Sequence, residues 1–126
     1  MKFAFVLVAA LALSSPAFAQ HAHTHDEKGP NGGPMVEVAG VDAELMAAGN
    51  TVTINVFDDG KKGVSTKGFS GSVLIVSGSD RETVTLAPTG DNSLKGEAKK
   101  PIAPSASITV VLKTAAGKSG QARYKR

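Results

Sequence analysis

Three histidines near the N-terminus are the residues whose type and spacing point most directly to chemistry. His21, His23 and His25 are the only histidines in the 126-residue chain. In an extended segment, alternate side chains lie on one side, about 7 Å apart along the backbone. Imidazole binds Cu(II), Zn(II) and Ni(II), and the affinity of nitrogen ligands is greatest for copper. The spacing predicts a metal site that prefers copper(II), with zinc or nickel less favoured.

Cleavage of an export signal would add ligands to this site. A cut after Ala19, which the flanking residues favour, makes Gln20 the first residue and His21 the second. The terminal amine, an amide nitrogen and an imidazole could then share a planar copper site, unless cyclisation of Gln20 blocks the amine. A cut after Gln20 would instead place His23 third, where the amine, two amides and the imidazole chelate copper or nickel.

Other residues offer weaker ligands. Asp26 and Glu27 follow the histidines and could add oxygen atoms. Met35 and Met46 carry thioethers suited to Cu(I), but at strand positions methionine is typically a packing residue. The metal prediction therefore depends on the three histidines.

The first nineteen residues have the pattern of an export signal. Met1-Lys2 is basic, residues 3–13 (FAFVLVAALAL) are apolar, and Ala17-Phe18-Ala19 is an A-x-A cleavage site. The apolar run is too short to cross a bilayer of about 30 Å as a helix. We expect a cleaved signal peptide over 1–19, a periplasmic location and no membrane attachment after cleavage. Residues 20–34, rich in Gly and Pro, are expected to form a flexible arm.

Composition disfavours several function classes. The chain has no cysteine, which excludes disulfides, thiolate metal sites and a cysteine nucleophile. Its charge of +3 is spread along the chain, and only Phe57, Phe69 and Tyr124 are aromatic after the signal, so nucleic-acid binding is not expected. A Ser-His-Asp triad needs a positioned histidine, and Asp58-Asp59 beside Gly60 is typical of a turn. We therefore expect no enzyme.

From Met35 onward the pattern has a period of two, which predicts strands. Ser72–Ser77 is apolar on both faces, which is typical of a central strand, and Phe57, Phe69 and Tyr124 are expected to fill the core. We expect one all-β domain over 35–126, an immunoglobulin-like antiparallel β-sandwich of about seven strands, with a closed barrel as the alternative. The expected strands centre on residues 35–38, 43–47, 51–57, 72–77, 82–86, 94, 108–112 and 122–124.

Several segments, taken in order, resemble a group of small exported bacterial proteins. They are Gly29-Pro30-Asn31-Gly32-Gly33, Val41-Asp42-Ala43-Glu44-Leu45-Met46, Val56-Phe57-Asp58-Asp59-Gly60-Lys61, Gly68-Phe69-Ser70-Gly71, Val84-Thr85-Leu86-Ala87-Pro88 and Gly90-Asp91-Asn92-Ser93-Leu94. Related segments occur in or near periplasmic adaptor subunits of heavy-metal efflux pumps. The resemblance implies a periplasmic β-sandwich with a link to metal handling. The relatives place histidines where this chain has Asn31 and Asp42, so only the arm histidines stay as candidates.

Two functions follow as hypotheses. The first is a non-enzymatic periplasmic protein whose arm binds a divalent metal and whose domain carries the arm or docks on a metal-efflux or other envelope protein. The second is a metal-independent interaction module that pairs with a partner through an edge strand.

Overall fold

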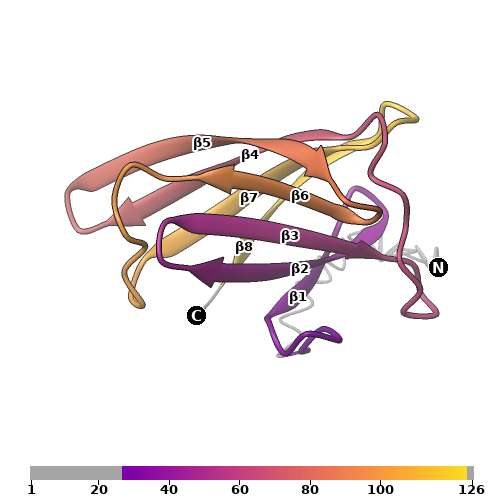
Figure 1. Cartoon of the computed structure of the whole chain (residues 1–126), viewed down its shortest axis with the longest axis horizontal. Helices are drawn as coiled ribbons and strands as arrows, with labels where there is room; N and C mark the ends of the chain where they lie inside the picture. Colours follow the sequence, from indigo (N-terminus) through magenta and orange to yellow (C-terminus); the bar gives the residue numbers. More distant parts are fainter. Residues whose placement is uncertain (1–26, 125–126) are drawn as a thin grey trace, which may run out of the picture.

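The computed structural model describes residues 27–124 (Figure 1). The predicted signal peptide and His21, His23 and His25 lie outside this range. Within it, the strands are β1 (Met35–Val38), β2 (Val41–Ala48), β3 (Thr51–Phe57), β4 (Ser70–Ser77), β5 (Asp80–Thr89), β6 (Ser93–Glu97), β7 (Ser107–Lys113) and β8 (Ser119–Tyr124). The described residues contain no helix long and apolar enough to cross a membrane.

All strand pairs are antiparallel and form one sheet in the order β1-β2-β3-β6-β5-β4-β7-β8. The sheet curls round, so that its two end strands, β1 and β8, come into contact (Figure 1). A Cβ atom at Gly120 on β8 would lie 2.9 Å from the Ala39 nitrogen just after β1. The structure is therefore a nearly closed sheet with a seam between β1 and β8.

The core lies inside this curled sheet and is made by alternate residues of its strands, as the period-two pattern predicts. The central strand β4 contributes Val73 and Ile75, between Val84 of β5 and Val110 of β7. Burying these aliphatic side chains supplies most of the driving force for folding, because each contributes about 1.5–3 kcal/mol when fully removed from water. With no disulfide in the chain, this packing stabilises the domain.

Tyr124 bridges the seam. Its ring belongs to the core cluster, and its hydroxyl donates a 2.7 Å hydrogen bond to the carbonyl oxygen of Ala43 on β2. Burial raises the pKa of this hydroxyl well above its usual range, and the negative charge of Asp42 adds to the effect. The phenol therefore stays protonated and keeps its hydrogen bond across the working pH range.

The expected all-β antiparallel class and the central position of β4 are confirmed. The eight strands fall on the eight expected segments, and the immunoglobulin-like sandwich stays a prediction. Phe57, Phe69 and Tyr124 are all buried, as expected. Phe57 lies outside the main core cluster, opposite Asp42 in the pairing of β2 with β3.

The chain turns after β3 at the expected place beside Gly60, and Phe57 and Gly63 form an isolated antiparallel bridge across the turn. Asp58 forms the expected turn, since its Oδ1 accepts hydrogen bonds of 2.9 Å from the nitrogens of Gly60 and Lys62. However, β3 pairs with β2 and β6, not with β4. Residues 58–69 therefore form a long connection from β3 to β4.

Replacing Tyr124 with Phe tests the seam. The variant leaves the buried Ala43 carbonyl without its donor, so we expect the free energy of unfolding to fall by about 1–2 kcal/mol. Urea denaturation measures the change. An unchanged midpoint would show that the bond contributes nothing to closure.

Candidate functional site

Residues 28–34, called here the N-terminal loop, lie where the predicted arm meets the domain. Lys28 and Pro34 form an isolated antiparallel bridge, and Gly29 N donates to Gly33 O at 2.7 Å. The Leu45 nitrogen of β2 donates to Pro34 O at 2.9 Å, which attaches the loop to the sheet. Residues 27–34 of the predicted 20–34 arm are thus packed on the domain, and its remaining residues lie outside the described range.

The N-terminal loop closes over the carboxylate of Glu44, which is 0% exposed. Glu44 Oε2 accepts hydrogen bonds from Asn31 N at 2.8 Å and Gly33 N at 3.0 Å. Its Oε1 accepts from Asn31 Nδ2 at 2.7 Å and, more weakly, from Asn55 Nδ2 at 3.4 Å. A buried carboxylate must be hydrogen-bonded to be tolerated, and here neutral amide donors provide those bonds.

The glycines of the loop are required by this close approach. A Cβ atom at Gly29 would lie 2.4 Å from Glu44 Cδ, and one at Gly33 would lie 2.3 Å from the Leu45 carbonyl oxygen. Any larger residue would therefore lift the loop from the carboxylate. The Gly-Pro-Asn-Gly-Gly sequence, taken for a flexible segment, instead fits one fixed conformation.

The Glu44 network continues across the outer face of the sheet. Asn55 on β3 accepts a 2.7 Å hydrogen bond at Oδ1 from the hydroxyl of Ser93 on β6. Among the described residues, the hydrogen-bond donors to the Glu44 carboxylate are all neutral amides. This arrangement fastens the loop to the sheet.

Glu27 fixes the point at which the chain enters the domain. Its carbonyl oxygen accepts a 2.9 Å hydrogen bond from Met35 N, and its Oε1 lies 2.5 Å from Lys61 Nζ. The hydrogen bond to Glu27 is the main cause that raises the pKa of Lys61. The ion pair therefore ties the entering chain to the β3–β4 connection.

Carboxylates gather around this entry point, which we call the acidic end and define as Glu27, Glu37, Asp42 and Asp59. Burial is the main cause that raises the pKa of Asp42, and the charges of Glu27, Asp59 and Glu37 raise it further against the opposing effect of Lys61. The acidic end thus contains four carboxylates, and the charge of Lys61 opposes their effect on Asp42. Such a group of negative charges attracts cations.

The predicted ligands His21, His23 and His25 lie outside the described residues, and His25 precedes Glu27 by two residues in the sequence. Among residues 27–124, no group of three or more His, Cys, Asp or Glu side chains could hold a metal. A metal site at this end would therefore need ligands from the arm.

The structure also places the other candidate residues. Met35 is 1% exposed and pairs in register with Glu44, so its thioether is enclosed under the N-terminal loop. Met46 lies on the same face, with its Sδ 2.6 Å from where a Gly33 Cβ would be. Both methionines therefore lie where their side chains can pack against the N-terminal loop. Asn31, at a position where the resemblance implies histidine, is occupied by its hydrogen bonds to Glu44.

Sequence reasoning missed Glu44 and Lys61. Glu44 appeared as an ordinary outward residue of an alternating strand, and Lys61 as a surface charge. The signal that could have found Glu44 is the dense Gly-Pro-Asn-Gly-Gly run immediately before the first strand, because glycines in that number indicate close backbone approach.

Comparison of the chain with protein-family models, curated proteins and solved structures finds no match.

Replacing Glu44 with Ala tests the loop attachment. The variant leaves the amides of Asn31 and Gly33 without their acceptor, so we expect a loss of about 3 kcal/mol in stability and faster hydrogen exchange at both amides. Glu37→Ala, which removes an exposed carboxylate nearby, should change stability by less than about 0.5 kcal/mol. Similar effects of the two substitutions would show that the Glu44 carboxylate does not hold the N-terminal loop in place.

Asp42 predicts a pH dependence. Because its pKa is raised above the ordinary value of 3.8, the folded state holds the proton more tightly, and ionisation destabilises the fold as the pH rises through this range. Asp42→Asn should therefore melt at a higher temperature than the native protein at pH 7. The difference should shrink towards about pH 3, where both states are protonated. A difference in melting temperature that stays constant across this pH range would contradict a raised pKa for Asp42.

Proposed function

We propose that this protein is a non-enzymatic, exported periplasmic protein that binds a divalent metal, preferably Cu(II), through His21, His23 and His25. The observation that carries the proposal is the fixed entry of the chain at Glu27, inside the acidic end. The Glu27–Lys61 pair and the N-terminal loop hold this entry point. In the sequence, His25 precedes Glu27 by two residues, which supports a site shared between the histidines and these carboxylates.

The acidic end supports the arm in two ways. Its negative charge raises the local concentration of divalent cations, and oxygen ligands such as Asp42 or Asp59 can complete an incomplete imidazole set. Ligand groups must be deprotonated to bind metal, and histidine meets this condition near neutral pH. The proposed link to metal efflux or homeostasis depends on the sequence resemblance alone.

The alternative, a metal-independent module that binds an envelope protein by strand addition, finds less support. Strand addition needs an open sheet edge. In this structure the two end strands contact each other, and Gly120 lies against the backbone at Ala39. An added strand would have to displace one of them.

Copper titration of the exported protein tests the proposal. Replacing all three histidines with Ala removes the ligands themselves. Cu(II) affinity should therefore fall by more than ~10–100-fold, which is the loss expected when only a ligand's hydrogen-bond partner is removed. Thermal unfolding of the metal-free protein should stay the same, because the substitutions precede the folded residues. Equal copper affinity in the native protein and the variant would end the proposal.

A matched pair of variants tests the role of the acidic end. Asp42→Asn with Asp59→Asn should lower copper affinity severalfold, and the loss should diminish as salt screens the field. Asp80→Asn with Asp91→Asn removes the same charge from exposed sites elsewhere and should leave affinity unchanged. Equal effects of the two pairs would show that only net charge matters.

A further inference from the structure

The outer face of β5, β4, β7 and β8, called here the acid-free face, differs from the rest of the surface. The register aligns its residues in rows across the four strands. Two rows are complete, Thr83-Leu74-Thr109-Arg123 and Thr85-Ser72-Val111-Gln121, and they are flanked by Arg81-Val76-Ser107 at one end and Ser70-Lys113-Ser119 at the other. None of these residues is acidic.

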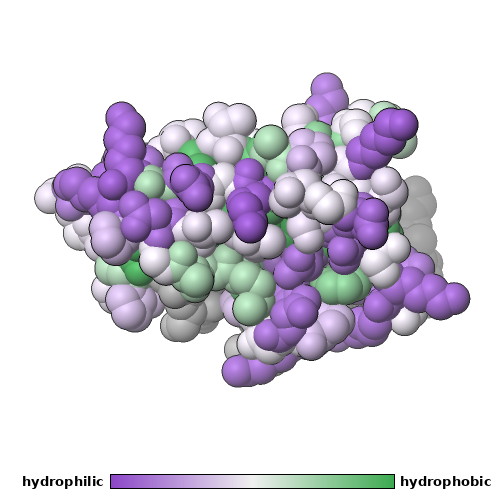
Figure 2. All heavy atoms as spheres, viewed as in Figure 1, coloured by the Kyte–Doolittle hydropathy of each residue, from purple (hydrophilic) through white to green (hydrophobic). Residues whose placement is uncertain are grey.

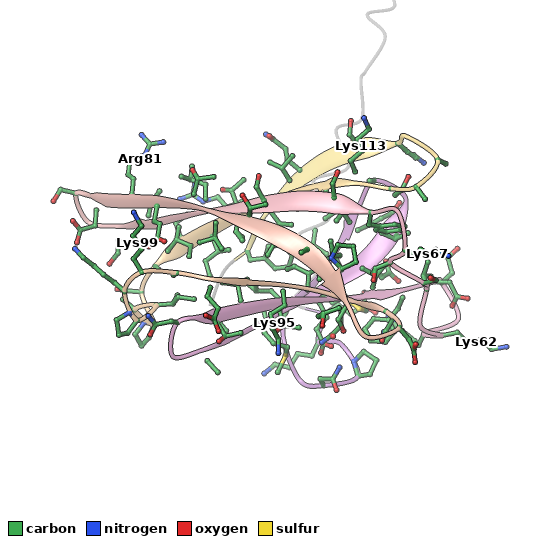
Figure 3. All side chains as sticks on the ribbon, turned by 45° about the horizontal axis from the view of Figure 1, so that its top comes forward. Lys62, Lys67, Arg81, Lys95, Lys99 and Lys113 are labelled. Atoms are coloured by element: carbon green, nitrogen blue, oxygen red, sulfur yellow. The ribbon has the colours of Figure 1, made fainter. Side chains whose placement is uncertain are left out.

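Cations stand at both ends of this face. Arg81, Lys113 and Arg123 are all exposed, and Figure 3 shows Arg81 and Lys113 projecting outward near opposite ends of the sheet. The end rows are six residues apart along β4, or about 20 Å. The positive charge is therefore spread over the whole face. No carboxylate of these rows neutralises it.

Hydroxyl and aliphatic side chains fill the area between the cations. Thr83 and Thr85 are exposed, and Val111, at 42% exposed, is the one large hydrophobic side chain found exposed among the described residues. Leu74 and Val76 are partly exposed beside it. These outward residues explain why β4 is apolar on both sides although one of its faces is open to solvent.

The two carboxylates of β5 are engaged elsewhere. Glu82 accepts hydrogen bonds from Lys99 N at 3.0 and 2.9 Å, and Asp80 lies 3.8 Å from Lys100 Nζ. Both alternate with Arg81 along β5 and so point to the other side of the sheet. By contrast, the outer face of β1, β2 and β3 bears Glu37, Asp42 and Glu44.

We propose that the acid-free face rests on an anionic lipid surface, which departs from the expectation of no membrane attachment after cleavage. A plane of lipid headgroups presents distributed negative charge, which matches cations spread over about 20 Å of sheet and is repelled by no carboxylate on the face. The hydroxyls donate to phosphate oxygens, and Val111 with Leu74 contacts the boundary below the headgroups.

An acidic protein segment is less well matched to this face. Peptide recognition needs a groove or pocket that defines a path. Of the residues of the acid-free face, only Arg81 lines either of two cavities formed among residues 27–124. One cavity, of about 610 Å³, lies between residues 63–67 and 88–92, and the other, of about 270 Å³, lies beside residues 80–82 and 98–103. Figure 2, which looks onto the β6–β3–β2 side, shows hydrophilic side chains around the rim and no broad apolar area there.

Vesicle co-sedimentation of the exported protein in EDTA tests the proposal independently of the metal site. We expect binding to phosphatidylcholine vesicles that contain phosphatidylglycerol, little binding to pure phosphatidylcholine, and release between about 0.05 and 0.5 M salt. Replacing Arg81, Lys113 and Arg123 with Gln should lower the partition coefficient by about tenfold or more.

The matched control replaces Lys28, Lys62 and Lys95 with Gln, which removes the same charge from exposed lysines outside this face. It should change partitioning by less than about threefold. Equal losses in the two triple variants, or no native binding to phosphatidylglycerol, would overturn the proposal. Sedimentation velocity without lipid gives a further test. A native oligomer that dissociates when Arg81, Lys113 and Arg123 are replaced would also overturn the proposal, because the face would then bind a second copy of the chain.

Discussion

The burial of one carboxylate, that of Glu44, determines how the N-terminal segment joins the domain. An ionised carboxylate in a dry site is tolerated only when hydrogen bonds replace its lost water. In this protein the donors are two backbone amides of the N-terminal loop and the side-chain amides of Asn31 and Asn55. The loop must therefore approach to contact distance, and this demand accounts for Gly29 and Gly33 in its sequence. No buried side-chain nitrogen or oxygen among the described residues is left without a partner.

This attachment gives the molecule two different sides. On one side, the loop, the Glu27–Lys61 pair and the carboxylates of the acidic end surround Glu27, which follows His25 by two residues in the sequence. On the other, the outer rows of β4, β5, β7 and β8 carry cations, hydroxyls and aliphatic groups without a carboxylate. The curled sheet joins the two sides at its seam, where β8 contacts β1. We propose that one side handles a metal and the other meets a lipid surface.

Much of the fold could be predicted from the sequence because most strands alternate between residues that face the core and residues that face outward. Val52, Ile54 and Val56 of β3 all lie inside, as their spacing requires. Closure could not be predicted, since contact between β1 and β8 depends on the twist and coiling of the entire sheet. Phe57 is buried as expected, but its place outside the main cluster could not be predicted, because that depends on the pairing of β3 with β2.

Only part of the candidate site could be predicted from the sequence. The imidazoles are recognisable by type and spacing alone, whereas Glu44 and Lys61 acquire their roles from residues 11 to 34 positions away. A glutamate in an alternating strand gives no local sign that a loop will cover it. Long-range hydrogen bonds of this kind become visible only when the register of β1, β2 and β3 is known.

Paramagnetic broadening of backbone amide signals by Cu(II) tests most directly the claim that the metal is held beside the Glu44-fastened loop. At substoichiometric copper, the account predicts selective loss of the amide signals of Asp42, Asp59 and Lys61, while those of Thr83 and Lys113 persist. Uniform broadening, or loss confined to the acid-free face, would contradict it.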